Sequence, residues 1–365
     1  MGYYDGLGST NLKASSYDVA RITDTPVILV INCKGMSLSI VPIIKGFKDY
    51  VINSNIKGVI LNNMSKMIYN EIKEVIEKEL EVEVFGYIPD LKELTIESRH
   101  LGLVTPNDIL DIKEKLNKLA EVLEETLNID GIIELANTVS SLRYNDVQVK
   151  KVDKKIKIAV AYDEAFCFYY EDNIQVLIDM GAEVVYFSPI KDSELPKDCS
   201  GIIIGGGYPE LYAKELSENI SMKNSIKVAI ENGLPTIAEC GGFMYLNQSL
   251  EDINGNIFEM IGLIKGNSYR TNKLGRFGYI ELIAKEDNYL LKKGEKTLAH
   301  EFHYWDSTCC GNKFIATKTL RNRNWDCINI YKNLIAGYPH IHFYSNLNIP
   351  FNFLSRCNDF SGGNI

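Results

Sequence analysis

The sequence predicts an α/β protein with two doubly wound parallel sheets, one in each of two domains. Short apolar runs alternate with helix-length amphipathic segments, which is typical of parallel strands joined by helices. At 365 residues the chain can bury two cores of ordinary size. Between residues 143 and 155 the periodicity fades and the charge density rises, which indicates a linker between the two domains.

Residues 1–142 are expected to form the first domain. Three continuous apolar runs predict strands that are buried on both faces of a sheet. They are PVILVIN (26–32), GVILNN (58–63) and EVFGYIP (83–89). In residues 105–128, apolar side chains recur at three and four positions, which predicts an amphipathic helix.

Residues 156–347 are expected to form the second domain, because the same alternation starts again there. Its predicted strands are IKIAVAY (156–162), AEVVYFS (182–188), GIIIGGG (201–207) and LPTIAEC (234–240). Its predicted helices lie around residues 172–180, 215–232 and 243–249. Strand-like segments dominate beyond residue 275, and residues 348–365 are expected to form a C-terminal tail.

The composition excludes several classes of protein. A net charge of -9 argues against a nucleic acid partner, which needs a concentrated basic face. No apolar run approaches the roughly 18 residues of a membrane span, and the N-terminus does not resemble a signal peptide, so we expect a cytoplasmic location and no membrane partner. The eight cysteines have no CxxC spacing, which favours reduced thiols over a zinc site or a disulfide framework.

The stretch AECGGFMYL (238–246) places a cysteine where a strand is expected to turn sharply into a helix. Such an elbow needs small residues two positions before and after its central residue, and these are Ala238 and Gly242. The start of a helix also favours a thiolate. Cys240 is therefore a candidate nucleophile above the carboxyl edge of the sheet.

A thiolate that attacks a carboxamide also needs an oxyanion hole and a base. Backbone N–H groups of Gly206, Gly207 and Gly241 are candidate donors to the oxyanion. In the stretch AGYPHIHF, His340 and His342 point to opposite faces of a predicted strand, so only one of them can serve as the base. The alternative interpretation is an inert buried cysteine, a glycine loop and a structural histidine pair.

Six segments of the second domain resemble the cobyrinic acid a,c-diamide synthase family, in matching order. They are DEAFCFYYEDN (163–173), GGGYPELYAKELSEN (205–219), GLPTIAECGGFMYL (233–246), LGRFGYIEL (274–282), HEFHYWD (300–306) and GYPHIHF (337–343). The first domain is similar to the ATP-dependent half of the same family through MGYYDG (1–6), PVILVINCKGMSLS, GVILNN and ESRHLGLV (97–104).

The resemblance implies a domain related to P-loop NTPases of the dethiobiotin synthetase type, followed by a class I, triad-type glutamine amidotransferase domain. It implies that L-glutamine is hydrolysed in the second domain and that ammonia passes to the first. There ATP with Mg²⁺ would activate the a and c carboxylates of a corrin polycarboxylate, a precursor of cobalamin, as phosphoryl esters. The implied activity is that of a carbon–nitrogen ligase with glutamine as the amido donor.

The resemblance also assigns individual residues. Cys240 matches the nucleophile and His340 the catalytic histidine, whereas position 342 holds a histidine where triad amidotransferases have a carboxylate. We therefore expect a Cys-His pair without a strong orienting acid. On the ATP side, Asp5 and Asn62 are the candidates, and no metal ligand is assigned.

The sequence contains no Gly-Lys dipeptide and hence no GxxxxGK[ST] phosphate loop, which in the family lies upstream of the segment that matches Met1. The expectation is a fragment or a chain with a companion, and glutaminase activity at best without help. The companion would be a chain that carries the phosphate-loop segment, and a homodimer is the other partnership expected.

A basic cluster in YRTNKLGRFGY is the candidate site for the polycarboxylate, with Tyr279 placed to stack on a macrocycle. The cluster consists of Arg270, Lys273 and Arg276, and a solvated loop is the alternative interpretation. His300 and His303 could be read as metal ligands, but a strand is expected there and the spacing of three would need a helix.

Three alternatives to the leading interpretation stay open. The tetrapyrrole could be hydrogenobyrinic acid or a nickel sirohydrochlorin, both of which relatives amidate. The chain could be an inactive fragment or a partner subunit. It could also be a generic class I amidotransferase, although that would leave HEFHY and FCFYYEDN unexplained.

Overall fold

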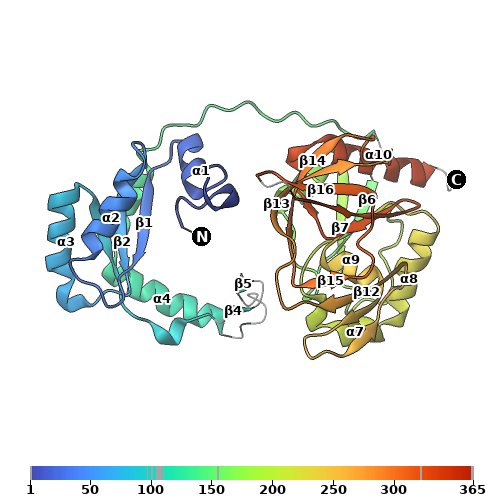
Figure 1. Ribbon diagram of the computed structural model, residues 1–365, viewed down its shortest axis with the longest axis horizontal. Coiled ribbons are helices and arrows are strands. Elements are labelled where there is room, and N and C mark those ends of the chain that lie inside the picture. Colours follow the sequence, from blue (N-terminus) through green and yellow to red (C-terminus); the bar gives the residue numbers. More distant parts are fainter. Residues whose placement is uncertain are drawn as a thin grey trace. The chain divides into compact units, whose positions relative to one another are not determined.

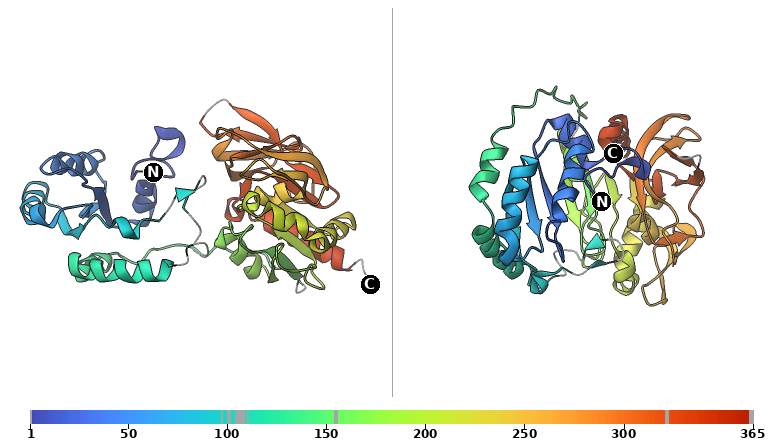
Figure 2. Two further views of the ribbon diagram at one scale, coloured as in Figure 1. Left: turned by 90° about the horizontal axis from the view of Figure 1, so that it is seen from below. Right: turned by 60° about the vertical axis from the view of Figure 1, so that its left-hand side comes forward.

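The computed structural model describes residues 2–96, 98–99, 102–103, 109, 111–153, 156–320 and 323–362. The chain divides into two compact units, Met1–Asp146 and Val147–Ile365. In Figures 1 and 2 the first unit runs from blue to green and the second from green to red. Residues 141–150, at the junction, contain neither helix nor strand.

The first unit is built on a parallel sheet of three strands in the order β1-β2-β3. The strands are β1 (Val27–Asn32), β2 (Ile56–Asn62) and β3 (Glu83–Ile88), close to the predicted ranges. Apolar side chains of α2 and α3, such as Ile44 and Ile76, pack with Val59 and Leu61 of β2 in one core. The parallel sheet confirms the predicted α/β class for this unit.

The remaining elements of the first unit surround or follow this sheet. They are η1 (Leu7–Ser9), α1 (Ser16–Thr23), α2 (Ile40–Asp49), α3 (Lys66–Leu80), η2 (Lys92–Leu94), the short pair β4 (Ser98–Arg99) and β5 (Gly102–Leu103), α4 (Ile112–Thr126) and α5 (Ile129–Ala136). The helix expected over 105–128 corresponds to α4, and residues 105–108 and 110 of that prediction lie outside the described residues.

The second unit contains a six-stranded sheet in the order β18-β19-β9-β8-β6-β7. All neighbours are parallel except β18, which runs antiparallel to β19. The strands are β6 (Ile156–Ala161), β7 (Ala182–Phe187), β8 (Gly201–Ile204), β9 (Thr236–Glu239), β18 (Asn329–Tyr331) and β19 (Leu334–Gly337). The middle strands are almost wholly buried, as continuous apolar runs predict.

One mixed and one antiparallel sheet complete the second unit. In the order β11-β10-β12-β15 the pair β10 and β12 is parallel, whereas all pairs in β17-β16-β13-β14-β20 are antiparallel. Figure 1 shows β13, β14 and β16 in orange beside β6 and β7. The strands of these two sheets are β10 (Asn247–Glu251), β11 (Ile257–Glu259), β12 (Ile264–Arg270), β13 (Phe277–Ala284), β14 (Lys296–Phe302), β15 (Trp305–Ser307), β16 (Phe314–Lys318), β17 (Asn324–Cys327) and β20 (His340–Ile341).

At Asn219 the helix expected over 215–232 is divided into two. Two other parts of the prediction also differ from the helices of this unit. These helices are α6 (Glu171–Asp179), η4 (Pro209–Leu211), α7 (Ala213–Glu218), α8 (Ile220–Glu231), α9 (Gly241–Leu246), η5 (Phe343–Ser345) and α10 (Asn348–Gly362). The helix predicted over 243–249 is wrong at its end, because Asn247 pairs with Ile264 of β12 and starts β10. Where a tail was expected, α10 buries Phe353 and Leu354 in the core.

Within the described part of the chain, no helix has both the length and the apolar character needed to cross a membrane.

Candidate active site

Cys240 lies at a sharp turn between β9 and α9, as the elbow prediction requires. Its backbone has φ +49° and ψ −102°, a region that non-glycine residues rarely occupy. The turn is held at both ends, because the Cys240 N–H donates to Gly337 O at 2.8 Å and Cys240 O accepts from Met244 N–H at 2.9 Å. The strained residue is thus fixed by its surroundings, an arrangement that is common at functional sites.

Small residues around the turn allow it to form. A Cβ on Gly242 would lie 2.1 Å from Ile204 O of the neighbouring strand, so position 242 has no room for a side chain. Ala238 is buried on the other side of the elbow. The predicted requirement for small residues two positions before and after Cys240 therefore has a steric basis here.

His340 lies on β20 and is buried beside the elbow. Its ring faces the backbone of Gly206, since a Cβ there would be 2.6 Å from His340 Cε1. The Phe168 ring meets it edge-on at 5.2 Å. Burial by itself lowers the pKa of His340, but the hydrogen bonds and negative charges of Cys240 and Glu239 outweigh burial and raise the pKa to about 10.

An acid next to His340 was not predicted, and the expectation of a Cys-His pair without one is wrong in this respect. Oε2 of Glu239 lies 3.6 Å from His340 Nδ1, and Oε1 accepts the N–H of Ile341 at 3.0 Å. The carboxylate comes from the residue before the cysteine, not from two residues after the histidine. The sequence signal was the acid in AEC itself.

His342 occupies a different environment from His340. Its side chain is about 40% exposed, and its Nε2 lies 3.6 Å from a carboxylate oxygen of Asp172. Rings of Tyr170 and Tyr344 lie beside it. Of the two histidines in the motif, the structure therefore brings His340 to Cys240 and Glu239, and leaves His342 at the surface.

The glycines predicted for an oxyanion hole come together at the elbow. A Cβ on Gly241 would lie 3.2 Å from Gly207 N, so these two backbones approach closely. Gly207 has φ +153°, and its own Cβ would lie 2.1 Å from Ala165 O. Gly241 opens α9, where N–H groups have no partner within the helix. The backbones of Gly207 and Gly241 therefore approach each other next to Cys240, and the backbone of Gly206 lies against the His340 ring.

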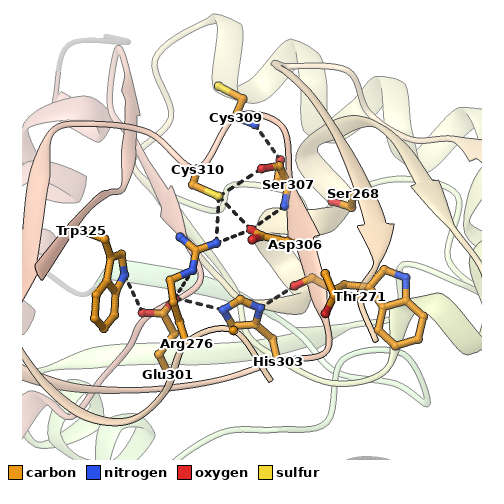
Figure 3. A network of polar contacts seen from close by, with 12 residues as sticks. Ser268, Thr271, Arg276, Glu301, His303, Asp306, Ser307, Cys309, Cys310 and Trp325 are labelled. Atoms are coloured by element: carbon orange, nitrogen blue, oxygen red, sulfur yellow. Dashed lines mark hydrogen bonds and ion pairs between the residues drawn. The ribbon is translucent and has the colours of Figure 1, made fainter. Parts of the chain in front are cut away.

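The basic cluster expected to meet a polycarboxylate is divided by the structure. Lys273 is exposed, and Tyr279 is half-exposed with its ring edge-on to His300 at 5.5 Å. Arg270 is exposed and donates to Ile253 O at 3.0 Å. Arg276 differs from the other two cations, because it is largely buried and ion-paired with Asp306 and Glu301 (Figure 3).

The buried network of Figure 3 explains the segment HEFHYWD. Glu301 is fully buried and lies 3.6 Å from Arg276 Nε, 3.0 Å from His303 Nε2 and 3.2 Å from Trp325 Nε1. The His303 ring stacks on Tyr338 at 3.8 Å, two residues before His340. Burial lowers the pKa of Arg276, but Cys310, Asp306 and Glu301 together outweigh burial and raise the pKa. The motif thus packs against the strand that carries His340.

The candidates on the ATP side lie in the first unit. Asp5 accepts the N–H of Gly2, and Asn62 ends β2 beside Asn32, the last residue of β1. Among the residues that the structure describes, no group of three or more His, Cys, Asp or Glu side chains could hold a metal ion. Asp5 and Asn62 do not by themselves form a site that fits ATP and Mg²⁺.

Comparison with known proteins gives a family for the second unit. Residues 157–347 match the CobB/CobQ-like glutamine amidotransferase domain. This range starts in β6 and ends just before α10, and it includes Cys240, Glu239 and His340.

Curated relatives extend the similarity to nearly the whole chain. The cobyrinate a,c-diamide synthase of Caldanaerobacter subterraneus subsp. tengcongensis is 40% identical over 363 residues, which cover 99% of this chain and 80% of that protein. The enzyme of the same name from Priestia megaterium is 39% identical, with 98% of this chain and 78% of that protein covered. The enzyme of the same name from Thermoplasma volcanium is 40% identical, with 98% of this chain and 78% of that protein covered.

Proposed function

The chain belongs to the cobyrinate a,c-diamide synthase family, and on that premise we propose that its second unit releases ammonia from glutamine at Cys240 for the amidation of corrin carboxylates. A protein of this family is a glutamine-dependent carbon–nitrogen ligase. The observation that carries the proposal is the elbow, in which a strained, buried cysteine meets a histidine with a raised pKa.

The first chemical step in this proposal is attack by sulfur. Nδ1 of His340 faces Glu239, which leaves Nε2 as the ring nitrogen for the Cys240 thiol. The Cys240 thiol has already given its proton to Nε2, as the raised pKa of His340 favours, and the thiolate attacks the side-chain carbonyl carbon of glutamine. The carbonyl oxygen becomes an oxyanion, and the N–H groups of Gly207 and Gly241 are the proposed donors to it.

The second step restores the enzyme. The amide nitrogen leaves as ammonia and takes the proton from His340, so that a thioester remains on Cys240. Water then hydrolyses this thioester to glutamate and regenerates the thiol. A histidine with a raised pKa suits this sequence, because it stays protonated at neutral pH until the leaving nitrogen accepts the proton.

The acceptor in this proposal is a corrin polycarboxylate, with ATP as the second substrate. ATP would convert a carboxylate to a phosphoryl ester that ammonia then displaces, and we assign no residue of this chain to that step. Arg270, Lys273 and Tyr279 are the proposed contacts for the acidic macrocycle. Arg276 is not among them, because Asp306 and Glu301 already match its charge.

The glutaminase proposal is tested with the Cys240→Ala variant. Glutamate release from glutamine should fall by at least about 1,000-fold while the thermal unfolding temperature stays within a few degrees of the parent. Cys327→Ala serves as the control, since Cys327 is buried in the core away from the elbow and should change stability more than activity. Retention of glutaminase activity in Cys240→Ala would refute the assignment.

The acceptor is tested by supplying glutamine labelled with ¹⁵N in the side-chain amide, together with ATP and Mg²⁺. Cobyrinic acid, hydrogenobyrinic acid and nickel sirohydrochlorin are offered in separate reactions, and mass spectrometry of each tetrapyrrole shows whether labelled amides form. With a chain that carries the phosphate loop added to the reaction, the proposal expects label in cobyrinic acid at two positions. Label in only one of the other two tetrapyrroles would replace the substrate while leaving the glutaminase step intact.

A further inference from the structure

Glu239 is a carboxylate whose two oxygens both contact the strand that carries His340. One oxygen accepts the backbone N–H of Ile341 at 3.0 Å, and the other lies 3.6 Å from Nδ1 of the His340 ring. The side chain of Glu239 is only 14% exposed, and that of His340 only 6%. Because both side chains are largely shielded from solvent, the carboxylate charge at 3.6 Å acts more strongly on the imidazole than it would in water.

The backbone of the elbow explains how an acid and a nucleophile on adjacent residues can reach the same ring. On a regular strand, neighbouring side chains point to opposite faces of the sheet. The positive φ of Cys240 breaks this alternation one residue after Glu239. The two side chains can therefore approach His340 from different directions, which places the thiol and the carboxylate at different ring nitrogens.

The distance of 3.6 Å is longer than a direct hydrogen bond, but the local packing leaves room for adjustment. Glu239 and His340 both line a cavity of about 20 Å³, together with Asn173 and Tyr170. A shift of the carboxylate toward Nδ1 by about 0.4 Å would bring the two atoms within hydrogen-bond distance. Catalytic hydrogen bonds are often long before substrate binds and shorten afterwards.

Other titratable groups face this pair from the elements packed against it. Cys240 interacts with the ring of His340, and His300 of β14 pairs in register with His340. Tyr169 and Tyr170, from the segment before α6, lie near Glu239. His300 carries no negative charge, and burial raises the pKa of both tyrosines. Among the described ion pairs, Glu239 is thus the carboxylate at His340.

We propose that Glu239 is a positioning residue for His340: its carboxylate holds the Nδ1–H, so that Nε2 faces the thiol, and it stabilises the imidazolium that forms when Cys240 loses its proton. The inference rests on the proposed glutaminase function. Glu239, the residue before the nucleophile, thereby takes the place of the carboxylate that triad amidotransferases have two residues after the histidine, where this chain has His342. Glu239 contacts neither sulfur nor substrate in this proposal and acts through His340.

The test compares two variants that each remove a carboxylate 3.6 Å from a histidine. Glu239→Gln should lower the glutaminase kcat by about 10- to 100-fold with KM within about twofold, because the amide cannot stabilise the imidazolium. Asp172→Asn removes the corresponding charge beside His342 and should leave kcat within about twofold. An unchanged kcat in Glu239→Gln, or equal losses in both variants, would overturn the proposal.

Two further readouts separate positioning from a general loss of structure. In Glu239→Gln the basic limb of the kcat profile should move to lower pH, because His340 loses its proton more easily without the carboxylate. Alkylation of Cys240 by iodoacetamide, located by mass spectrometry, should slow at neutral pH. Glu239→Asp should recover part of both. A pH profile that does not move would argue for a structural role only.

The wild-type protein provides a test that does not depend on the folding of a variant. With ¹⁵N-labelled histidine, the ring nitrogen shifts of His340 should report a proton on Nδ1 across neutral pH, with the resonances assigned through a His340→Gln variant. A signal that shows Nδ1 without a proton overturns the proposal. Glutaminase activity in Cys240→Ala would instead overturn the function on which it rests, so the two failures are distinguishable.

Discussion

A single methyl group at position 206 should displace the base of the active site. Gly206 has no positive φ, so alanine can adopt its backbone conformation. The added Cβ would lie 2.6 Å from His340 Cε1, whereas carbon atoms in contact are separated by roughly 3.5 Å or more. The imidazole must therefore move by about 0.9 Å or more, away from the place where it meets Cys240.

A displacement of this size is large for proton transfer, because misplacing a catalytic group by about 1 Å can cost about 100-fold in rate. We expect Gly206→Ala to lower the glutaminase kcat by roughly that factor while the thermal unfolding temperature changes by only a few degrees. The backbone N–H of residue 206 is kept in this variant. The fall in kcat therefore reports the displacement of the His340 ring and not the removal of a hydrogen-bond donor.

The matched control for this variant is Gly275→Ala. A Cβ on Gly275 meets nothing within 4 Å in the described structure, and its φ is not in the left-handed region. It should keep full activity. Wild-type kcat and KM in a folded Gly206→Ala protein would refute the placement of His340 against this backbone.

Three other changes follow from the buried groups of the second unit. Glu301→Gln should lower the free energy of unfolding in urea by about 3 kcal/mol, because it leaves Arg276 buried without one of its two carboxylates. The control Asp326→Asn, which breaks an exposed ion pair, should lower it by less than about 1 kcal/mol. Tyr338→Phe should be neutral or stabilise by about 1 kcal/mol, because the buried hydroxyl has no hydrogen-bond partner among the described residues; a clear loss of stability would contradict this. The raised pKa of His340 implies that its proton stabilises the folded state, fully below about pH 6.5 and no longer once pH rises through about 10. The free energy of unfolding, measured across this pH range, should therefore fall less in His340→Asn than in the parent protein.

Much of the fold could be predicted from local patterns. Continuous apolar runs identified the central strands, and Ala238 and Gly242 identified the elbow, because a tight turn excludes large side chains at those two positions. The pair His340 and His342 followed from its place at the end of the last strand-rich stretch, and the family resemblance selected His340 from the pair. These features depend on residues close together in the sequence or on general rules of α/β sheets.

The partners of individual charges could not be predicted in the same way. Arg276 looked like one of three surface cations, but Glu301 and Asp306, which come from β14 and β15, enclose it. Nothing near Arg276 in the sequence indicates that pairing. The acid beside His340 was missed for a related reason, since Glu239 reaches the ring only when Gly337 of β19 pairs with Glu239 of β9.

The short segment from Gly337 to Ile341 links these two sets of observations. Gly337 O holds the backbone N–H of Cys240, Ile341 N–H holds the carboxylate of Glu239, and His340 supplies the ring between them. Tyr338 in the same segment stacks on His303 at 3.8 Å and packs edge-on against Phe243 of α9 at 4.9 Å. A shift of this segment would therefore move the base, its acid and the nucleophile's backbone together. The buried network of Arg276 and Glu301 lies outside the elbow, yet through His303 and Tyr338 it fixes the strand on which the geometry of all three depends.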